Sequence, residues 1–181
     1  MNVAFANRTQ KCRSLNNFST LTSIISALAT APIHRLARTW QQVNDKTKNV
    51  LESMRKLMAS TKNFAEYRDF LHKANPPCIP FLGVYLTDLT FIEDGIPSII
   101  KKTDLINFAK HAKTAEVISD IQQYQNAPYP LQPVPELQDY ILSNMRTAGD
   151  VHEMYELSLT VEPREREDEK IARSVALMSY S

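Results

Sequence analysis

Two neighbouring acids, Glu93 and Asp94, are the best candidates for a chemical role in this 181-residue sequence. They end a helix that is predicted from Phe81, and acids in a last helical turn oppose the helix macrodipole at a cost of about 0.3 kcal/mol or more. A functional demand on an acid is one explanation of this placement, and a merely solvated helix end is the other. Because adjacent helical residues point about 100° apart, the two carboxyl groups do not form a facing acid–base pair.

Motifs for metal, nucleotide or covalent chemistry are missing from the sequence. Its four histidines lie far apart, and it contains neither an HExxH pair nor a Cys/His set with metal-ligand spacing. The three glycines are too dispersed for a phosphate loop or a dinucleotide fingerprint, and Gly-x-Ser-x-Gly does not occur. We therefore expect that the protein holds no metal ion and no cofactor, and that it is not an enzyme that works by covalent chemistry.

The acids belong to a predicted helical hairpin at about residues 81–125. Pro76, Pro77 and Pro80 make a rigid entry, and Gly95 with Pro97 stops the first arm. The apolar face of that arm repeats at three- and four-residue steps and consists of Phe81, Val84, Tyr85, Leu89 and Ile92.

The second arm is predicted from an N-cap at Asp104 to Gln125 and is roughly 30 Å long at ~1.5 Å per residue. Its expected inner face is Leu105, Phe108, Ala112, Ala115, Ile118 and Ile121. The opposite face carries Lys110, His111, Lys113, Glu116 and Asp120. A solvated face and a binding face both explain these charges.

Composition favours one all-α domain. Glycine is scarce and most segments show the helical period, so we expect an irregular helical bundle with a protruding antiparallel hairpin. A net charge of +1 without a basic stripe argues against nucleic acid as a partner. Cys12 and Cys78 stand alone, which suits the reducing cytoplasm, and neither a signal peptide nor a spanning stretch is recognised.

Further helices are predicted on both sides of the hairpin. Earlier ones cover residues 18–31, a short stretch ending near Val43, 45–59 with Asp45 as N-cap, and 63–74 with Asn63 as N-cap. A proline-rich strap at 128–135 leads to helices at 135–144 and 150–158. The charged run at 165–170 is expected to be a solvated tail.

Several of these stretches resemble the Cdc25-homology (RasGEF) catalytic domain of Ras-family guanine nucleotide exchange factors. The resemblance is carried by NPPCIPF at 75–81, GVYLTDLTFIEDG at 83–95, LINF at 105–108 and IQQYQN at 121–126. Earlier pieces at 15–18, 26–28 and 31–36 and later ones at 155–159 and 161–164 agree in order and separation. The match covers roughly residues 10–165.

The resemblance implies an exchange factor whose hairpin displaces the first switch segment of a small GTPase. It places Thr90 where an apolar side chain crowds the magnesium ion, and Asp94 where an acid engages the phosphate loop. These two are the expected catalytic positions. The residues implied to bind the GTPase are His34, Phe64, Phe81, Gly83, Val84, Thr87, Lys113 and Tyr124.

The sequence departs from the family pattern in places. Asp94 stands where Glu is common, Thr90 where Leu or Val is common, and Ala29 where a contacting Asn is usual. We expect a short N-terminal segment (1–14), a RasGEF catalytic domain that lacks its N-terminal part (15–164) and a charged tail (165–181). The alternative is a truncated interaction module that binds a GTPase without promoting exchange. The expected partner is a Ras-family GTPase whose lipid brings this cytoplasmic protein to the membrane without direct insertion.

Overall fold

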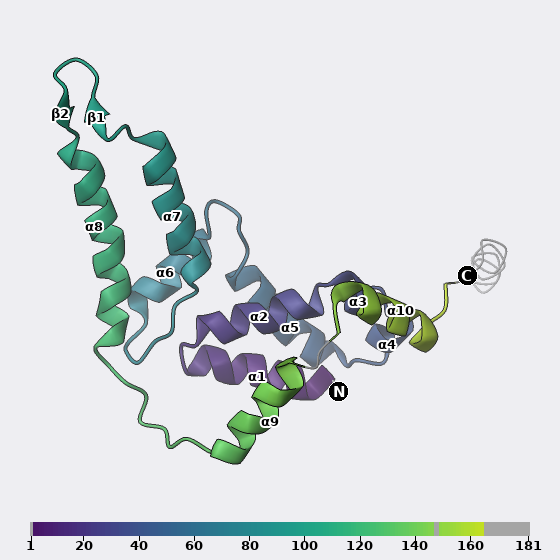
Figure 1. Ribbon diagram of the computed structural model, residues 1–181. Helices are drawn as coiled ribbons and strands as arrows, with labels where there is room; N and C mark the ends of the chain where they lie inside the picture. The colour runs from purple at the N-terminus through teal and green to yellow at the C-terminus, as the bar shows by residue number, and fades with distance from the viewer. Residues whose placement is uncertain (1, 147–148, 165–181) are drawn as a thin grey trace. The chain divides into compact units, whose positions relative to one another are not determined.

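Helices dominate the computed structural model, which describes residues 2–146 and 149–164 (Figure 1). The predicted all-α class is confirmed, with one small antiparallel sheet added. The helices before the sheet are α1 (Asn2–Ser14), α2 (Phe18–Leu28), α3 (Ala31–His34), α4 (Ala37–Gln41), α5 (Asp45–Leu57), α6 (Ala65–Lys73) and α7 (Leu82–Gly95). After it come α8 (Phe108–Gln122), the 3-10 helix η1 (Gln123–Gln125), α9 (Pro135–Arg146) and α10 (Val151–Val161).

The described residues form two compact units. The first contains those within 1–27 and 43–132, and the second those within 28–42 and 133–181. The expected charged tail at 165–170 lies outside the described residues. None of the helices that the structure describes combines the length and the apolar character that crossing a bilayer would need.

The core of the first unit is where α2, α5, α6 and α7 meet. Phe18 and Tyr67 are fully buried, and their rings pack edge to face at 5.2 Å. Phe70 adds a second edge-to-face contact to Phe18 at 5.6 Å. Burying a large apolar side chain contributes about 1.5–3 kcal/mol, so this cluster is the platform on which the base of α7 rests. The cluster also contains Leu21, Met54, Leu57, Met58, Leu71, Cys78, Val84 and Tyr85.

Two predicted helix starts are wrong by one residue. Asn44, not Asp45, is the N-cap of α5, because its side chain accepts the backbone N–H of Thr47 at 2.8 Å. Phe64, not Asn63, precedes α6, and it does so with a left-handed φ of 58°. The predicted short helix that ends near Val43 is in fact the pair α3 and α4.

The predicted hairpin is present, with a different tip. Helices α7 and α8 lie side by side in opposite directions and extend away from α1, α2 and α5 (Figure 1). The second arm does not start at Asp104, which adopts a left-handed turn with φ 53°. Instead, β1 (Ile99–Ile100) pairs with β2 (Leu105–Ile106), and the helix begins three residues later than predicted, after Asn107.

The proline-rich strap is confirmed as irregular chain between η1 and α9. Tyr129 anchors it to the first unit, since its hydroxyl donates a hydrogen bond to the carbonyl oxygen of Leu15. Both later helices are confirmed, and Asp150 with Glu153 forms a capping box at the start of α10.

In the second unit, Glu162 and Arg35 join α10 to α3 and α4. The guanidinium of Arg35 donates to the carbonyl oxygens of Ser158 and Glu162, each at 2.7 Å. The Glu162 carboxylate accepts the hydroxyl and backbone N–H of Thr39, each at 2.7 Å. The hydroxyl bond lowers the pKa of Glu162, and the carboxylate satisfies N–H groups at the start of α4.

Candidate functional site

Four of the predicted site residues lie on one face of α7. Gly83, Thr87, Thr90 and Asp94 follow each other at steps of four, three and four residues, so they line up along the helix. Thr87, Thr90 and Asp94 are exposed. We call all four residues together the outer stripe. The opposite face carries Val84, Tyr85 and Asp88 and is buried or half-buried.

The two threonines of the outer stripe have their hydroxyls engaged within the helix. Thr87 donates to the carbonyl oxygen of Gly83 at 2.8 Å, and Thr90 donates to that of Leu86 at 2.9 Å. Such back-bonding satisfies the donor of the hydroxyl. An apolar group of another molecule could therefore cover Thr90 without leaving its hydroxyl donor unpaired.

At the base of the outer stripe, Gly83 makes room for an aromatic pair. A Cβ on Gly83 would lie 2.5 Å from the Phe81 ring, so this ring folds over a place that only glycine leaves open. The Phe81 ring centroid is 6.1 Å from that of Phe64. Both rings are half-buried and pack on the core, so Phe64 and Phe81 combine a core role with some accessible surface.

Two other residues that were predicted to contact the GTPase pack against other residues of this chain. Val84 is 1% exposed and belongs to the core cluster, so it supports the surface from beneath. Tyr124, from η1, is half-buried and hydrogen-bonded to the buried Tyr85 of α7. Burial raises the pKa of both phenols.

An ion pair braces the middle of α7 against α6. The Arg68 guanidinium donates to both carboxylate oxygens of Asp88 at 2.8 Å, and its Nε donates to the carbonyl oxygen of Asn63 at 2.9 Å. Both side chains are less than a third exposed. A bidentate pair of this kind fixes orientation as well as distance, so α7 is held against rotation on α6. The sequence interpretation missed this pair, since the two residues lie twenty positions apart with no periodic relation.

Lys110 corrects the predicted faces of α8. It was expected on the exposed, charged face of the helix, yet it is 4% exposed and its amine lies at the end of α7. Phe108 and Ile118, expected on the inner face, are 77% and 43% exposed. Ile121 does pack on the core, as predicted, together with Val117 and Tyr124. The steps from Lys110 through Thr114, Val117 and Ile121 to Tyr124 also fit a helical face and could have revealed this orientation.

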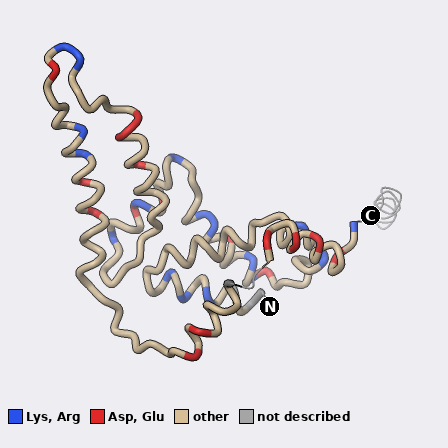
Figure 2. The backbone as a smooth tube through the Cα atoms, in the orientation of Figure 1, with Lys and Arg blue, Asp and Glu red and all other residues tan. Residues whose placement is uncertain are grey.

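The remaining predicted contact residues are exposed. Lys113 lies on α8, and His34 lies in α3 of the second unit. Figure 2 shows how charge is distributed along the hairpin: acids at the end of α7, both bases and an acid in the tip, bases in the first half of α8, and acids in its second half. Strand β2 of the tip is apolar and accessible, with Leu105 and Ile106 about two-thirds exposed.

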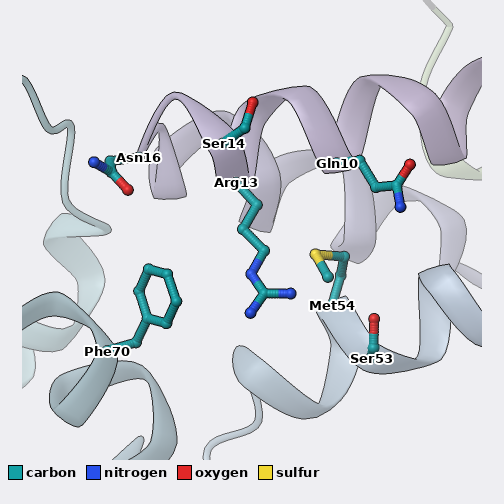
Figure 3. A pocket seen from close by; sticks show the side chains of 7 residues that line it. All are labelled: Gln10, Arg13, Ser14, Asn16, Ser53, Met54 and Phe70. Carbon is teal, nitrogen blue, oxygen red and sulfur yellow. The ribbon is translucent and has the colours of Figure 1, made fainter. Parts of the chain in front are cut away.

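A separate open groove of about 470 Å³ lies among α1, α5 and α6. Figure 3 shows the Arg13 side chain between Met54 and Phe70, and its guanidinium lies 5.3 Å from the Phe70 ring centroid. The hydroxyls of Ser14 and Ser53 donate to backbone carbonyls of their own helices. None of the predicted site residues lines this groove. Across the described residues, no three His, Cys, Asp or Glu side chains are grouped as a metal ion would require.

Fold and site together define an all-α domain organised around a two-helix hairpin that presents a polar stripe. The model of the RasGEF domain family matches residues 3–112. The chain is 46% identical over 158 residues to "Cell division control protein 25" of Candida albicans. It is 41% identical over 162 residues to "Ras guanine nucleotide exchange factor efc25" of Schizosaccharomyces pombe, and 39% over 153 residues to "Ras-specific guanine nucleotide-releasing factor 2" of Danio rerio.

The chain belongs to the RasGEF domain family. The alignments cover 86%, 88% and 84% of this chain, respectively. They cover only 12%, 16% and 12% of those relatives, so the chain spans a small part of their length.

Proposed function

We propose that this chain is a guanine nucleotide exchange factor domain that promotes GDP release from a Ras-family GTPase. The observation that carries the proposal is the outer stripe: Thr90 and Asp94 are exposed on one face of α7 while the other face is braced. Membership of the RasGEF family and the printed names of its relatives supply the partner class.

The work of such a domain is binding, not bond making. A small GTPase holds its nucleotide through a phosphate loop, a lysine and a magnesium ion. Coupling between two ligands is reciprocal, so a chain that binds the nucleotide-free GTPase more tightly lowers nucleotide affinity by the same factor. A thousandfold effect requires about 4 kcal/mol of differential contact, which a steric wedge and one charge contact can supply.

The proposed roles follow the order of residues along α7. Asp94 offers a carboxylate to the phosphate loop, where it takes the place of a phosphate group. Thr90 crowds the magnesium position, and the donor of its hydroxyl is already bonded within the helix. Near the base, Thr87, Gly83 and the Phe64–Phe81 pair form a surface for the second switch, supported from beneath by Val84 and Tyr124.

Lys113 and His34 are proposed as additional contacts from α8 and α3. Because Ras-family GTPases carry lipid, the complex would work at a membrane to which the partner is attached. The chain needs no membrane insertion of its own in this scheme.

The test is release of a fluorescent GDP from purified Ras, Rap and Ral proteins in excess unlabelled GDP. The chain should accelerate release from at least one of them. Asp94→Asn should lower the catalysed rate about tenfold or more, which corresponds to ~1.4 kcal/mol of lost coupling. Thr90→Ala should lower it less, because it removes volume but no charge.

Asp104→Asn is the matched control, since Asp104 is an exposed acid of the same hairpin that lies in the turn between β1 and β2, outside the outer stripe. It should leave the rate unchanged, and Asn tolerates its left-handed φ. A chain that accelerates release from none of the three GTPases overturns the proposal. If it co-purifies with a GTPase and still releases no nucleotide, the non-catalytic interaction module is the better description.

A further inference from the structure

Lys110 is a buried cation whose three N–H donors all have acceptors. Its Nζ donates to the carbonyl oxygen of Glu93 at 3.2 Å and to the hydroxyl of Ser98 at 3.0 Å. It also lies 2.8 Å from a Glu93 carboxylate oxygen. The Lys110 side chain is 5% exposed, and the Glu93 side chain is 71% exposed. An ammonium group has three donors, so the end of α7 and the segment after it are joined to α8 at one point.

The charge on Lys110 suits the place where it lies. The last turn of a helix carries partial negative charge on its free carbonyls, and Glu93 and Asp94 add two carboxylates. One cation within hydrogen-bond distance of a backbone carbonyl in that turn offsets part of this repulsion. It also distinguishes the two acids, because Glu93 is engaged by Lys110 while Asp94 lies on the exposed outer stripe.

We propose that Lys110 is a positioning residue for Asp94, and this inference rests on the proposed function. The lysine fixes the last turn of α7 relative to α8, so that Asp94 meets the phosphate loop of the GTPase in one orientation. By engaging Glu93 it also leaves Asp94 as the acid of the pair that is available to the partner. The three contacts to Glu93 and Ser98 carry this proposal.

A purely stabilising role explains the lysine less well. Removing one partner of an ion pair is costly when the other charge is left buried, but the Glu93 side chain is 71% exposed and would stay solvated, so methionine could fill the space of Lys110. What methionine cannot supply is a directed link to a carbonyl, a carboxylate and a hydroxyl on the facing arm. The loss expected on substitution is therefore one of geometry at Asp94 and not of folding.

The test measures GDP release over a range of chain concentrations for Lys110→Met, Lys110→Arg and Glu93→Gln, each alone and combined with Asp94→Asn. Lys110→Met should lower the maximal release rate about tenfold while the half-saturating concentration changes less than about twofold, since the base of the hairpin still binds. Lys110→Arg should recover most of the rate. Glu93→Gln keeps the carbonyl and Ser98 contacts and should stay within about threefold of the parent.

The combined variants separate positioning from general damage. If Lys110 acts through Asp94, then Lys110→Met should cause no further loss in the Asp94→Asn background. Equal losses in both backgrounds, or an unchanged maximal rate for Lys110→Met, would overturn the inference while leaving the exchange function intact. A parent chain without activity would instead overturn the proposed function.

A measurement on the chain alone keeps the inference testable without a GTPase. The amide of Ile96 donates to the carbonyl oxygen of Ile92 at 3.2 Å, next to the Lys110 contacts. Its hydrogen exchange should accelerate in Lys110→Met, while the amide of Val84 at the base keeps the parent's rate. Unchanged exchange at Ile96 would overturn the idea that Lys110 holds this turn.

Discussion

At the base of the α7–α8 hairpin, α7 is joined to α6 and η1 by several buried side chains, whereas at the tip its last turn is joined to α8 through Lys110. Base residues such as Val84 and Tyr85 are buried, and the Tyr67 hydroxyl accepts the backbone N–H of Phe81 at 2.8 Å. The tip strands are exposed on both faces. Within one hairpin, packing therefore changes from core-like to nearly solvent-exposed.

This difference suggests a division of work between the two ends. Residues at the base sit on the core, so substitutions there should change the stability of the unit before they change any contact. Exposed residues toward the tip, such as Thr90 and Asp94, contact little of the rest of the chain, so the effect of replacing them should appear mainly when a partner is present. Three measurements on the unfolding of the chain can break or sharpen this comparison.

The largest effect is expected at Tyr67. Tyr67→Ala removes a fully buried ring and should lower the free energy of unfolding by about 3–5 kcal/mol. Tyr67→Phe keeps the ring and removes only the acceptor for the Phe81 N–H, so it should cost about 1 kcal/mol. Urea unfolding followed by circular dichroism measures both. Similar losses for the two variants would show that the hydroxyl, and not the ring, holds the base.

The same division decides what the sequence could reveal. The first arm was predictable because its signals are local: prolines before Phe81, a regular apolar period, and Gly95 with Pro97 after it. The tip was not, since Leu105 and Ile106 pair with residues across a turn. Asp104 and Asn107 are equally good N-cap types, so local sequence did not decide between them. Lys110 was misplaced for a related reason. A charged residue is expected in solvent unless its acceptors are known, and these come from the other arm.

A smaller effect for each residue is expected from alkaline pH, which also acts at the base. Burial raises the pKa of Tyr67, Tyr85 and Tyr124 above the ordinary value of 10.0. A raised folded-state pKa contributes stability that is complete below pH 10 and is lost as the pH rises further. The free energy of unfolding should fall between pH 10 and 11 by up to about 1.4 kcal/mol per pH unit for each such group.

Tyr85→Phe provides the control for this pH effect. Burial also raises the pKa of Cys78, to about 11, and that thiol is retained in parent and variant alike. The difference between the two slopes therefore reports Tyr85 together with its hydrogen bond to Tyr124, and the variant should lose less stability above pH 10. Parallel slopes would mean that Tyr85 loses its proton as easily in the folded chain as in the unfolded one.

The smallest change in stability is expected at the tip, where the proposed activity is concentrated. Thr90→Ala removes an exposed, back-bonded threonine and introduces the strongest helix former, so the free energy of unfolding should rise by up to about 0.5 kcal/mol. Asp94→Asn removes a charge that opposes the macrodipole and should raise it by about 0.3 kcal/mol. Urea unfolding of both variants beside the parent measures the change in stability, and their GDP release rates measure the change in exchange. A variant that is slightly more stable but releases GDP more slowly would show that the parent residue lowers stability and serves exchange. A loss above about 1 kcal/mol for either variant would place these residues in the folded framework and remove the contrast between base and tip.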